Sequence, residues 1–212
     1  MIICPGEQGG QQWINARIGL PTASCFDKIL TSKKLQASES QGGYIAKIVT
    51  EWLTGETLDP AVTDYIQRGA DMEKEAVDFY DMERGVDSEP VGFIMRDDKL
   101  AGCSPDRMVP TQKGAVELKV PAAHTHVLYL LYGPGTDYRM QVQGQLWCMP
   151  EIEWVDFLSY HPNMPPYLQR FEREEEVQAA LDIEMPKFHT KLDAAKRRLI
   201  ALGCTQRERI AA

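Results

Sequence analysis

The segment from Ser104 to Lys119 constrains the fold more than any other part of the chain. Strand character is found before and after the turn 110–114, and such a turn folds neighbouring strands into a hairpin. Because a strand projects alternate side chains to one face, Glu117 and Lys119 point the same way, roughly 7 Å apart along the strand. Asp106 lies at the end of the preceding strand, so the hairpin brings it beside them.

This trio of charges is the candidate for chemistry. Two hard oxygen ligands beside one amine can hold Mg²⁺ and orient a water molecule for hydrolysis of a phosphodiester. The alternative is a solvated hairpin with three ordinary charges, since a short pattern of this kind also arises by chance.

Composition sets the class of protein. The chain has 212 residues, of which 43% are apolar and 25% charged, as in one soluble globular domain. No apolar run approaches the ~20 residues of a membrane span, and the first residues lack a signal-peptide pattern, so a cytoplasmic protein is expected. The five cysteines form no Cys-x-x-Cys pair, which argues against a zinc ribbon or a disulfide framework. His124 and His126 are expected at the surface.

The net charge of −8 at first argues against a nucleic-acid partner, which normally meets a basic surface. Metal-dependent nucleases reverse this reasoning locally, because bound cations neutralise their clustered carboxylates. Basic residues also cluster within 28–34 and 191–198. Charge therefore leaves the partner open.

Hydrophobic periodicity and turn residues predict the order of the elements. Helices are expected over residues 11–17, 22–30, 44–53, 60–84, 122–132, 137–149 and 174–202, with a polar loop over 32–43. Strands are expected over 91–95, 100–103 and 115–120, as a meander, and over 153–160 and 167–171. The order predicts one α/β domain spanning residues 1–212, with a mixed β-sheet flanked by helices. Its parts are a helical region 1–85, a catalytic sheet with a crossover helix 86–172, and a C-terminal helix 173–212.

Three positions outside the hairpin strengthen the hypothesis of a nuclease. Glu73 falls on the inner side of the long helix 60–84, where a carboxylate is costly unless it is paired or near a metal. Gln141 and Gln143, on the helix after the crossover, can bond a phosphate or the attacking water, although most such glutamines lie at surfaces. Arg17 precedes Thr22-Ala23-Ser24, where free amides, a hydroxyl and a guanidinium would converge on a terminal phosphate.

Six short motifs follow one another along the chain: Trp13…Arg17, Thr22-Ala23-Ser24, Gly69…Glu73, Cys103-Ser104-Pro105-Asp106, Glu117-Leu118-Lys119 and Met140-Gln141-Val142-Gln143…Trp147. In this order and at these spacings they resemble the lambda exonuclease (YqaJ-type viral recombinase) family of the PD-(D/E)xK nuclease superfamily. The resemblance runs from about residue 13 to 160. One departure is Arg107, which follows Asp106 where the family shows glycine; it is expected to alter the local turn without removing the carboxylate.

The resemblance implies a metal centre at the hairpin. Asp106 and Glu117 would ligate Mg²⁺ together with the backbone carbonyl of Leu118, and Asp106 would bridge to a second Mg²⁺, with Mn²⁺ as a substitute. Lys119 would orient or deprotonate the attacking water, helped by Gln141.

The resemblance also implies a direction and an assembly. Glu73 would act through metal-bound water, and Arg17 with Ser24 would hold the 5′-phosphate of the strand being degraded. The implied activity is a Mg²⁺-dependent 5′→3′ exonuclease on linear double-stranded DNA, which releases mononucleotides and leaves 3′ single strands for recombination by annealing. A ring-shaped homotrimer, a single-strand annealing protein as partner, and the cytoplasm of a bacterial or phage-infected cell are implied with it.

The sequence is also compatible with other functions. One is another nuclease of the superfamily, either a restriction-type endonuclease or a RecB-like exonuclease. The latter is disfavoured because Gln145, not tyrosine, stands four residues after Gln141. A further alternative is a non-catalytic DNA-binding protein with the same fold. The C-terminal helix carries an apolar stripe suited to packing, while its basic end 196–198 suits either DNA or a neighbouring subunit.

Overall fold

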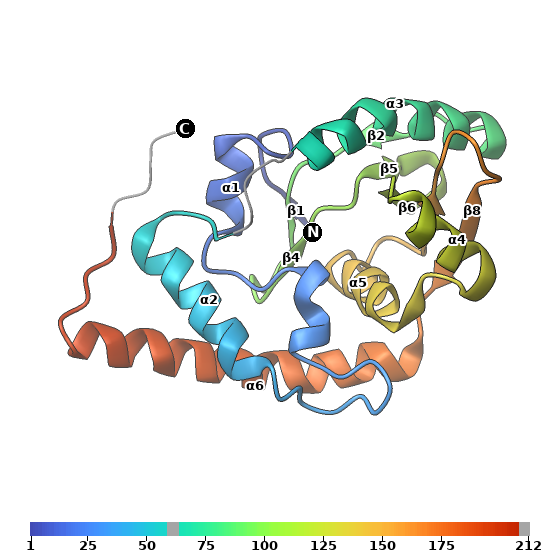
Figure 1. The fold of residues 1–212 in the computed structure, drawn as a ribbon. Helices are drawn as coiled ribbons and strands as arrows, with labels where there is room; N and C mark the ends of the chain where they lie inside the picture. Colours follow the sequence, from blue (N-terminus) through green and yellow to red (C-terminus); the bar gives the residue numbers. More distant parts are fainter. Residues whose placement is uncertain (59–63, 208–212) are drawn as a thin grey trace.

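The computed structural model describes residues 1–58 and 64–207, without the side chains of 64–71 and 137. Its helices are α1 (Gln11–Arg17), η1 (Ala23–Lys28), α2 (Gln41–Thr54), α3 (Asp64–Arg84), η2 (Pro110–Gln112), α4 (Ala123–Tyr132), α5 (Gly135–Cys148) and α6 (Glu175–Ala201). Its strands are β1 (Ile2–Ile3), β2 (Glu89–Pro90), β3 (Ile94–Met95), β4 (Gly102–Cys103), β5 (Arg107–Val109), β6 (Gly114–Lys119), β7 (Trp154–Ser159) and β8 (Tyr167–Glu172) (Figure 1). The mixed α/β class is confirmed.

Two sheets form where the sequence predicted a single meander. The main sheet has the order β2-β5-β6-β7-β8, in which β6 and β7 are parallel and the other pairs antiparallel. Helices α4 and α5 make the crossover between the parallel strands, as expected. The predicted meander is wrong, because β3 and β4 pair with β1 in a separate three-stranded sheet. Pro105 has no N–H for a ladder, and the chain leaves β4 there to begin a new strand, β5.

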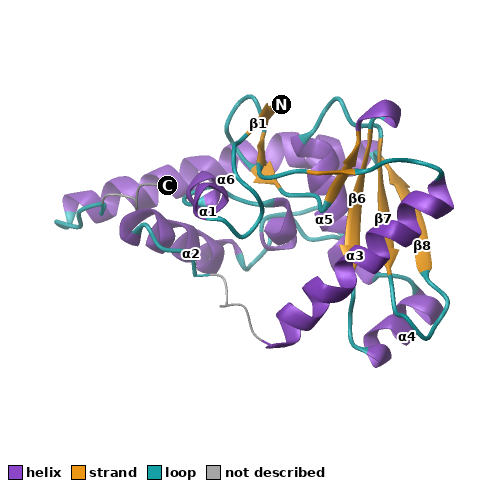
Figure 2. Cartoon of the chain, turned by 90° about the horizontal axis from the view of Figure 1, so that it is seen from above, coloured by secondary structure: helices purple, strands orange, loops and turns teal. Residues whose placement is uncertain are grey.

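Alternate residues of β6 face opposite helices, as the two-residue period of a strand requires. Val116 and Leu118 pack with Tyr80 of α3, whereas Ala115 belongs to the larger core shared with α5 and α6. Figure 2 shows α3 lying across the strands of the main sheet. The odd-numbered face of β6 therefore points to the α5 side, and this places Glu117 there.

A buried carboxylate ties α3 to the sheet. Asp156 of β7 is fully buried and accepts hydrogen bonds from the hydroxyl of Tyr80 at 2.9 Å and from Arg170 at 2.8 and 2.9 Å. Arg84 Nε lies 3.2 Å from the same carboxylate. A buried charge is tolerated when it is paired in this way. The contacts fix the helix that carries Glu73.

The long helix α6 packs mainly through its expected apolar stripe. Leu181, Met185, Phe188 and Leu192 are fully buried. Ile183 was also expected in this stripe, and that prediction is wrong, because its side chain is 60% exposed. Near the basic end, Lys196 Nζ lies 5.4 Å from the centre of the Trp52 ring and 3.4 Å from the carbonyl oxygen of Gly19. This lysine therefore contacts the helical region of its own chain. None of the described helices is long and apolar enough to cross a membrane.

Several boundaries differ from the sequence prediction. The helix expected over 22–30 is the 3₁₀ helix η1, and the Thr22 side chain makes no cap hydrogen bond. Helix α2 begins three residues inside the predicted loop 32–43. Residues 60–63 of the expected helix 60–84 lie outside the described residues. His126 is wrong as a surface residue: it is fully buried, with Nδ1 2.7 Å from Ser159 Oγ and Nε2 2.9 Å from the Pro165 carbonyl oxygen.

Candidate active site

The β5–β6 hairpin holds Asp106 in place from two sides. Asp106 stands just before β5, not at the end of β4 as predicted, and its N–H donates to the carbonyl of Val116 at 3.0 Å. Its Oδ2 accepts a 2.6 Å hydrogen bond from the backbone N–H of Leu118. Within the described chain Oδ1 accepts no hydrogen bond, so it stays available to a ligand.

Glu117 lies at the centre of a set of donors. The residue is 2% exposed, and its Oε1 accepts from Lys119 Nζ and from Gln141 Nε2, the latter at 2.5 Å. Its Oε2 accepts from Gln145 Nε2, also at 2.5 Å. The structure thus brings Asp106, Glu117, Lys119 and Gln141 together. Gln143 points elsewhere, to the backbone carbonyl of Glu172 at 2.7 Å.

The charges of this set act on one another. Burial, followed by the negative charge of Glu117, raises the pKa of Asp106 to about 7, against the opposing effects of Lys119 and the Leu118 N–H. Burial alone would lower the pKa of Lys119, but Glu117 and Asp106 outweigh it and hold that pKa above its ordinary value. At neutral pH the lysine is therefore a cation between two carboxyl groups, and the site favours further positive charge.

Asp106 faces a cleft of about 450 Å³. The cleft is lined by Gly6, Glu7, Gln8, Glu73, Pro90, Val91, Gly92, Asp106 and Arg107. Glu73 is exposed on α3, so its predicted place on an apolar inner face is wrong, although it does share the cleft with Asp106. The side-chain amide of Gln8 donates to the carbonyls of Pro105 at 2.8 Å and Val91 at 3.0 Å, which fixes the N-terminal segment as a wall of the cleft.

Arg107 leaves the position of Asp106 intact. It begins β5, opposite Val116 in the β5–β6 ladder and Pro90 in the β2–β5 ladder. Its guanidinium donates to the hydroxyl of Ser88 at 3.1 Å and to the Ser88 carbonyl. The described non-glycine residues with positive φ are Leu35, Lys99 and Lys113, so the backbone at 107 does not require glycine.

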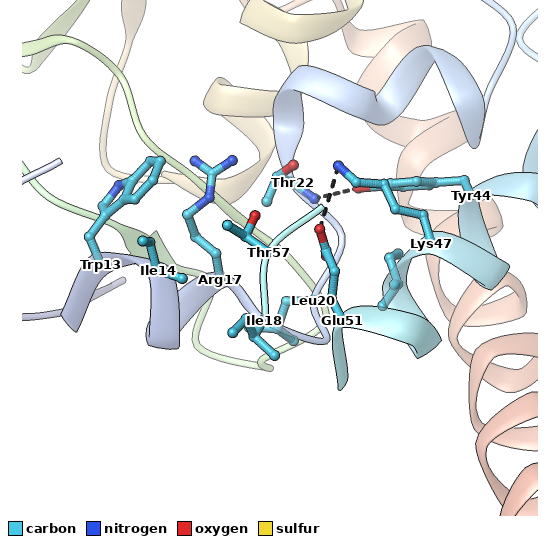
Figure 3. A pocket seen from close by; sticks show the side chains of 11 residues that line it. Trp13, Ile14, Arg17, Ile18, Leu20, Thr22, Tyr44, Lys47, Glu51 and Thr57 are labelled. Carbon is cyan, nitrogen blue, oxygen red and sulfur yellow. Dashed lines mark hydrogen bonds and ion pairs between the residues drawn. The ribbon is translucent and has the colours of Figure 1, made fainter. Parts of the chain in front are cut away.

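Arg17 lies in a shallow pocket between α1 and α2 (Figure 3). Its guanidinium stacks 3.9 Å from the centre of the Trp13 ring. The enclosed volume is about 20 Å³, room for about one water molecule, so a phosphate would sit at the mouth. Across the pocket, the N–H of Thr22 donates to the hydroxyl of Tyr44 at 2.9 Å. Ser24 does not line the pocket but is joined to it through Thr22 Oγ1, 3.2 Å from Ser24 Oγ.

Two contacts connect this pocket to the hairpin. Trp13 Nε1 donates to Ser104 Oγ at 2.9 Å, two residues before Asp106. Helix η1, just after the pocket, rests on α5 at Gly144, where an added Cβ would lie 2.6 Å from the Phe26 ring. A glycine is needed there for the close approach.

The donor set fits a hard divalent cation. The described residues hold no group of three or more His, Cys, Asp or Glu side chains able to bind a metal. Mg²⁺, however, usually keeps several waters and binds through one or two carboxylates and substrate phosphates. Asp106 and Glu117 supply that pair.

Some site residues escaped the sequence reasoning. In the sequence Gln145 stands out only as a departure from tyrosine, yet its spacing of four residues from Gln141 puts both on one helix face. Trp13 was part of a motif without a role, and its contact with Ser104 spans 91 residues, beyond any local pattern. Gln8 gave no signal in the sequence.

The fold and this site define the class of protein. The mixed sheet carries Asp106 and Glu117-Leu118-Lys119 on one hairpin, and the crossover helix presents Gln141. This arrangement is the PD-(D/E)xK nuclease fold. The profile of the YqaJ-like viral recombinase domain matches residues 12–150. The chain therefore belongs to the YqaJ-like viral recombinase family, the lambda exonuclease family of nucleases.

Solved structures agree with this assignment. An alkaline exonuclease (LHK-Exo) from Laribacter hongkongensis superposes with a TM-score of 0.79 at 29% identity, over 92% of this chain and 98% of that one. The same protein in complex with dAMP gives 0.79 at 28% identity, with the same coverage. A phage-related exonuclease from Haemophilus somnus 129PT shares the fold, with a TM-score of 0.68 at 14% identity over 85% and 96% of the two chains. No curated protein sequence matches the chain.

Proposed function

We propose that the protein is a Mg²⁺-dependent 5′→3′ exonuclease that degrades one strand of linear double-stranded DNA and leaves a 3′ single strand. The observation that carries the proposal is the hairpin cluster. Asp106 lines the cleft and interacts with Glu117 and Lys119, and Glu117 in turn accepts hydrogen bonds from Lys119 and Gln141. The similar Laribacter exonuclease has been solved with dAMP, which supports mononucleotides as products.

Each residue of the cluster has a proposed task. Asp106 and Glu117, with the Leu118 carbonyl, would hold two Mg²⁺ ions, or Mn²⁺ in their place, and Asp106 would bridge them. The ions would supply charge stabilisation and an activated water. Lys119 is held cationic by its carboxylate neighbours, so its first task is to orient that water or the phosphate. Gln141 fixes Glu117 Oε1.

The polarity of digestion would come from the Arg17 pocket. The Arg17 guanidinium stacks on Trp13 at this pocket, and an arginine can contact a phosphate through two hydrogen bonds. Ser24, joined through Thr22, would add a hydroxyl, while Glu73 would act from the cleft through metal-bound water. A 5′-phosphate bound there would direct the strand toward the hairpin.

The assembly and setting are proposed with the activity. A homotrimeric ring around the DNA would keep the enzyme on its substrate, and a single-strand annealing protein would receive the 3′ strand. Both would act in the cytoplasm of a bacterial or phage-infected cell.

An end-labelled linear duplex tests the activity, its polarity and its need for metal together. With Mg²⁺ we expect a 5′ label to be released at once as a mononucleotide and a 3′ label to persist. EDTA should abolish release of the 5′ label. Asp106→Ala should be inactive. Cleavage of covalently closed circles would instead identify a restriction-type endonuclease, and undiminished digestion by Asp106→Ala would refute the metal assignment.

Arg17→Ala separates end recognition from chemistry. Digestion of 5′-phosphorylated ends should slow by about 10-fold or more, the scale of one lost charge-assisted contact, while 5′-hydroxyl ends change little. Equal losses on both substrates would contradict a phosphate pocket at Arg17.

A further inference from the structure

Helix α5 directs two glutamines at a single carboxylate. Gln141 and Gln145, four residues apart, each donate a 2.5 Å hydrogen bond to Glu117, one to Oε1 and the other to Oε2. Gln145 is the deeper of the two, with 1% of its surface exposed. Hydrogen bonds to an ionised acceptor are roughly twice as strong as neutral ones, so this pair fixes the orientation of Glu117.

The amide oxygen of the Gln145 side chain lacks a hydrogen bond from any residue that the structure describes. Its Oε1 is the one buried side-chain nitrogen or oxygen atom of the described chain that has no hydrogen-bond partner. Leaving such an acceptor unpaired costs about 1–3 kcal/mol, which an apolar side chain of the same size would avoid. A glutamine at this position is therefore better explained by its bond to Glu117 than by the stability of the fold.

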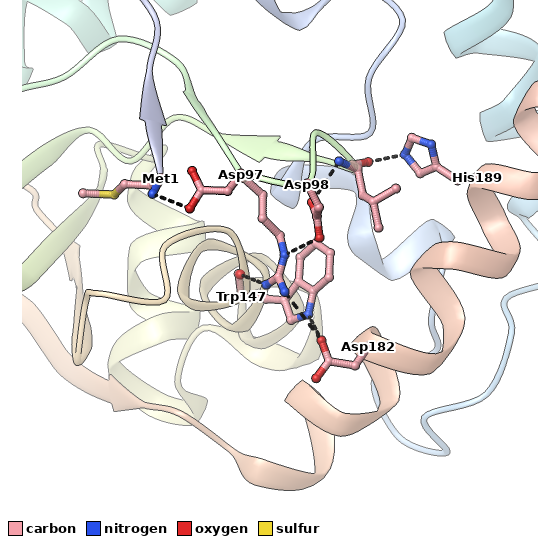
Figure 4. Close-up of polar contacts among 8 residues, drawn as sticks. Met1, Asp97, Asp98, Trp147, Asp182 and His189 are labelled. Carbon is pink, nitrogen blue, oxygen red and sulfur yellow. Dashed lines mark hydrogen bonds and ion pairs between the residues drawn. The ribbon is translucent and has the colours of Figure 1, made fainter.

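The end of α5 that carries Gln145 is held by the contacts of Trp147, which Figure 4 shows. Two residues further on, Trp147 Nε1 donates to Asp182 of α6 at 2.8 Å, and the Trp147 carbonyl accepts from Arg96 at 2.6 Å. The Arg96 guanidinium also stacks 3.9 Å from the Trp147 ring centre. Gln145 therefore has a fixed position from which to hold Glu117.

We propose that Gln145 is a positioning residue that sets the orientation in which Glu117 meets the divalent cation. Oε1 of Glu117 is already engaged by Lys119 and Gln141, and the Gln145 bond is the one that Oε2 accepts from the described residues. The inference rests on the proposed function, in which Glu117 is a metal ligand. Loss of such an outer partner typically weakens metal binding about 10- to 100-fold.

Mn²⁺ binding to the full-length protein, followed by electron paramagnetic resonance of the free ion, tests this role without DNA or turnover. Gln145→Met removes the amide at nearly constant volume. The matched control is Gln143→Met, on the same helix and fully buried, whose side chain bonds the backbone of Glu172 and Glu174. We expect Gln145→Met to raise the Mn²⁺ dissociation constant about 10- to 100-fold and Gln143→Met to leave it within about twofold.

Wild-type Mn²⁺ affinity in Gln145→Met would overturn the inference, and so would an equal loss in Gln143→Met, which would indicate general loosening of α5. If the methionine variant does not fold, Gln145→Asn tests the positioning role of Gln145 in its place. It keeps a buried amide but is one methylene too short to reach Glu117, so the same loss is expected and wild-type affinity would refute the role. A wild-type protein that binds no Mn²⁺ would instead refute the metal-dependent function itself.

Discussion

Replacing Asp106 with asparagine should remove a pH-dependent loss of stability from the metal-free protein. The pKa of this carboxyl is raised from 3.8 to about 7, mainly by burial and then by the charge of Glu117. The folded protein therefore binds the proton more tightly than the unfolded chain does. The resulting stability is fully present below about pH 4 and is lost as the pH rises through about 7.

The size of the effect follows from the shift. About three pH units, at about 1.4 kcal/mol each, give about 4 kcal/mol. This is an upper limit, because Asp106 is only partly buried and solvent screens its interactions. Asparagine keeps an oxygen that can accept the 2.6 Å hydrogen bond from the Leu118 N–H, so the comparison isolates the charge.

Urea unfolding in EDTA, between about pH 4 and pH 8, measures the difference in free energy between wild type and Asp106→Asn. Plotting the difference removes the contribution of His189, whose pKa is lowered by burial and whose contribution to stability is lost as the pH falls. The variant should gain on the wild type as the pH rises, and Mg²⁺ should restore the wild type by replacing the proton. A difference that stays flat across this range would show that Asp106 is not the titrating group.

Three further predictions test the framework around the site. Trp13→Phe removes the donor to Ser104 while keeping a ring under Arg17. It should lower the unfolding free energy by about 1 kcal/mol and slow the release of nucleotides. Ser104→Ala should give a similar loss, and the double variant should lose no more than either single variant. Asp156→Asn should lower the free energy of unfolding in urea by about 2–3 kcal/mol. This is less than the loss of a fully buried ion pair, because the arginine partners of Asp156 reach solvent. An unchanged urea midpoint would mean that the network does not hold α3. Gly144→Ala should lower the free energy of unfolding by about 1–3 kcal/mol through overpacking. At an open helix position the same change would raise it by roughly 1 kcal/mol. A stabilised variant would therefore contradict the close contact.

Local patterns were sufficient for the hairpin but not for the sheets around it. The period of a strand places Glu117 and Lys119 on one face without further information, and the structure agrees. Strands of two or three residues, such as β1, β2 and β5, are too short to show alternation. Their pairing is decided by distant segments, as when Ile2–Ile3 joins Ile94–Met95.

The candidate site divides in the same way. The hairpin, together with the family resemblance, named Asp106, Glu117, Lys119 and Gln141, which the structure brings together. Gln145 was visible in principle, because a spacing of four residues shares a helix face with Gln141. The exposure of Glu73 could not be foreseen, since a helix face shows its burial only once the neighbouring layers are placed.

The link between Trp13 and Ser104 and the close contact of Phe26 with Gly144 make the Arg17 pocket and the hairpin parts of one body. If a strand end is bound at the first and cut at the second, the interval between them cannot stretch with the DNA or with its sequence. The length of each released fragment would then be set by the distance between the two sites in the folded protein, and it would be the same at every step along the strand.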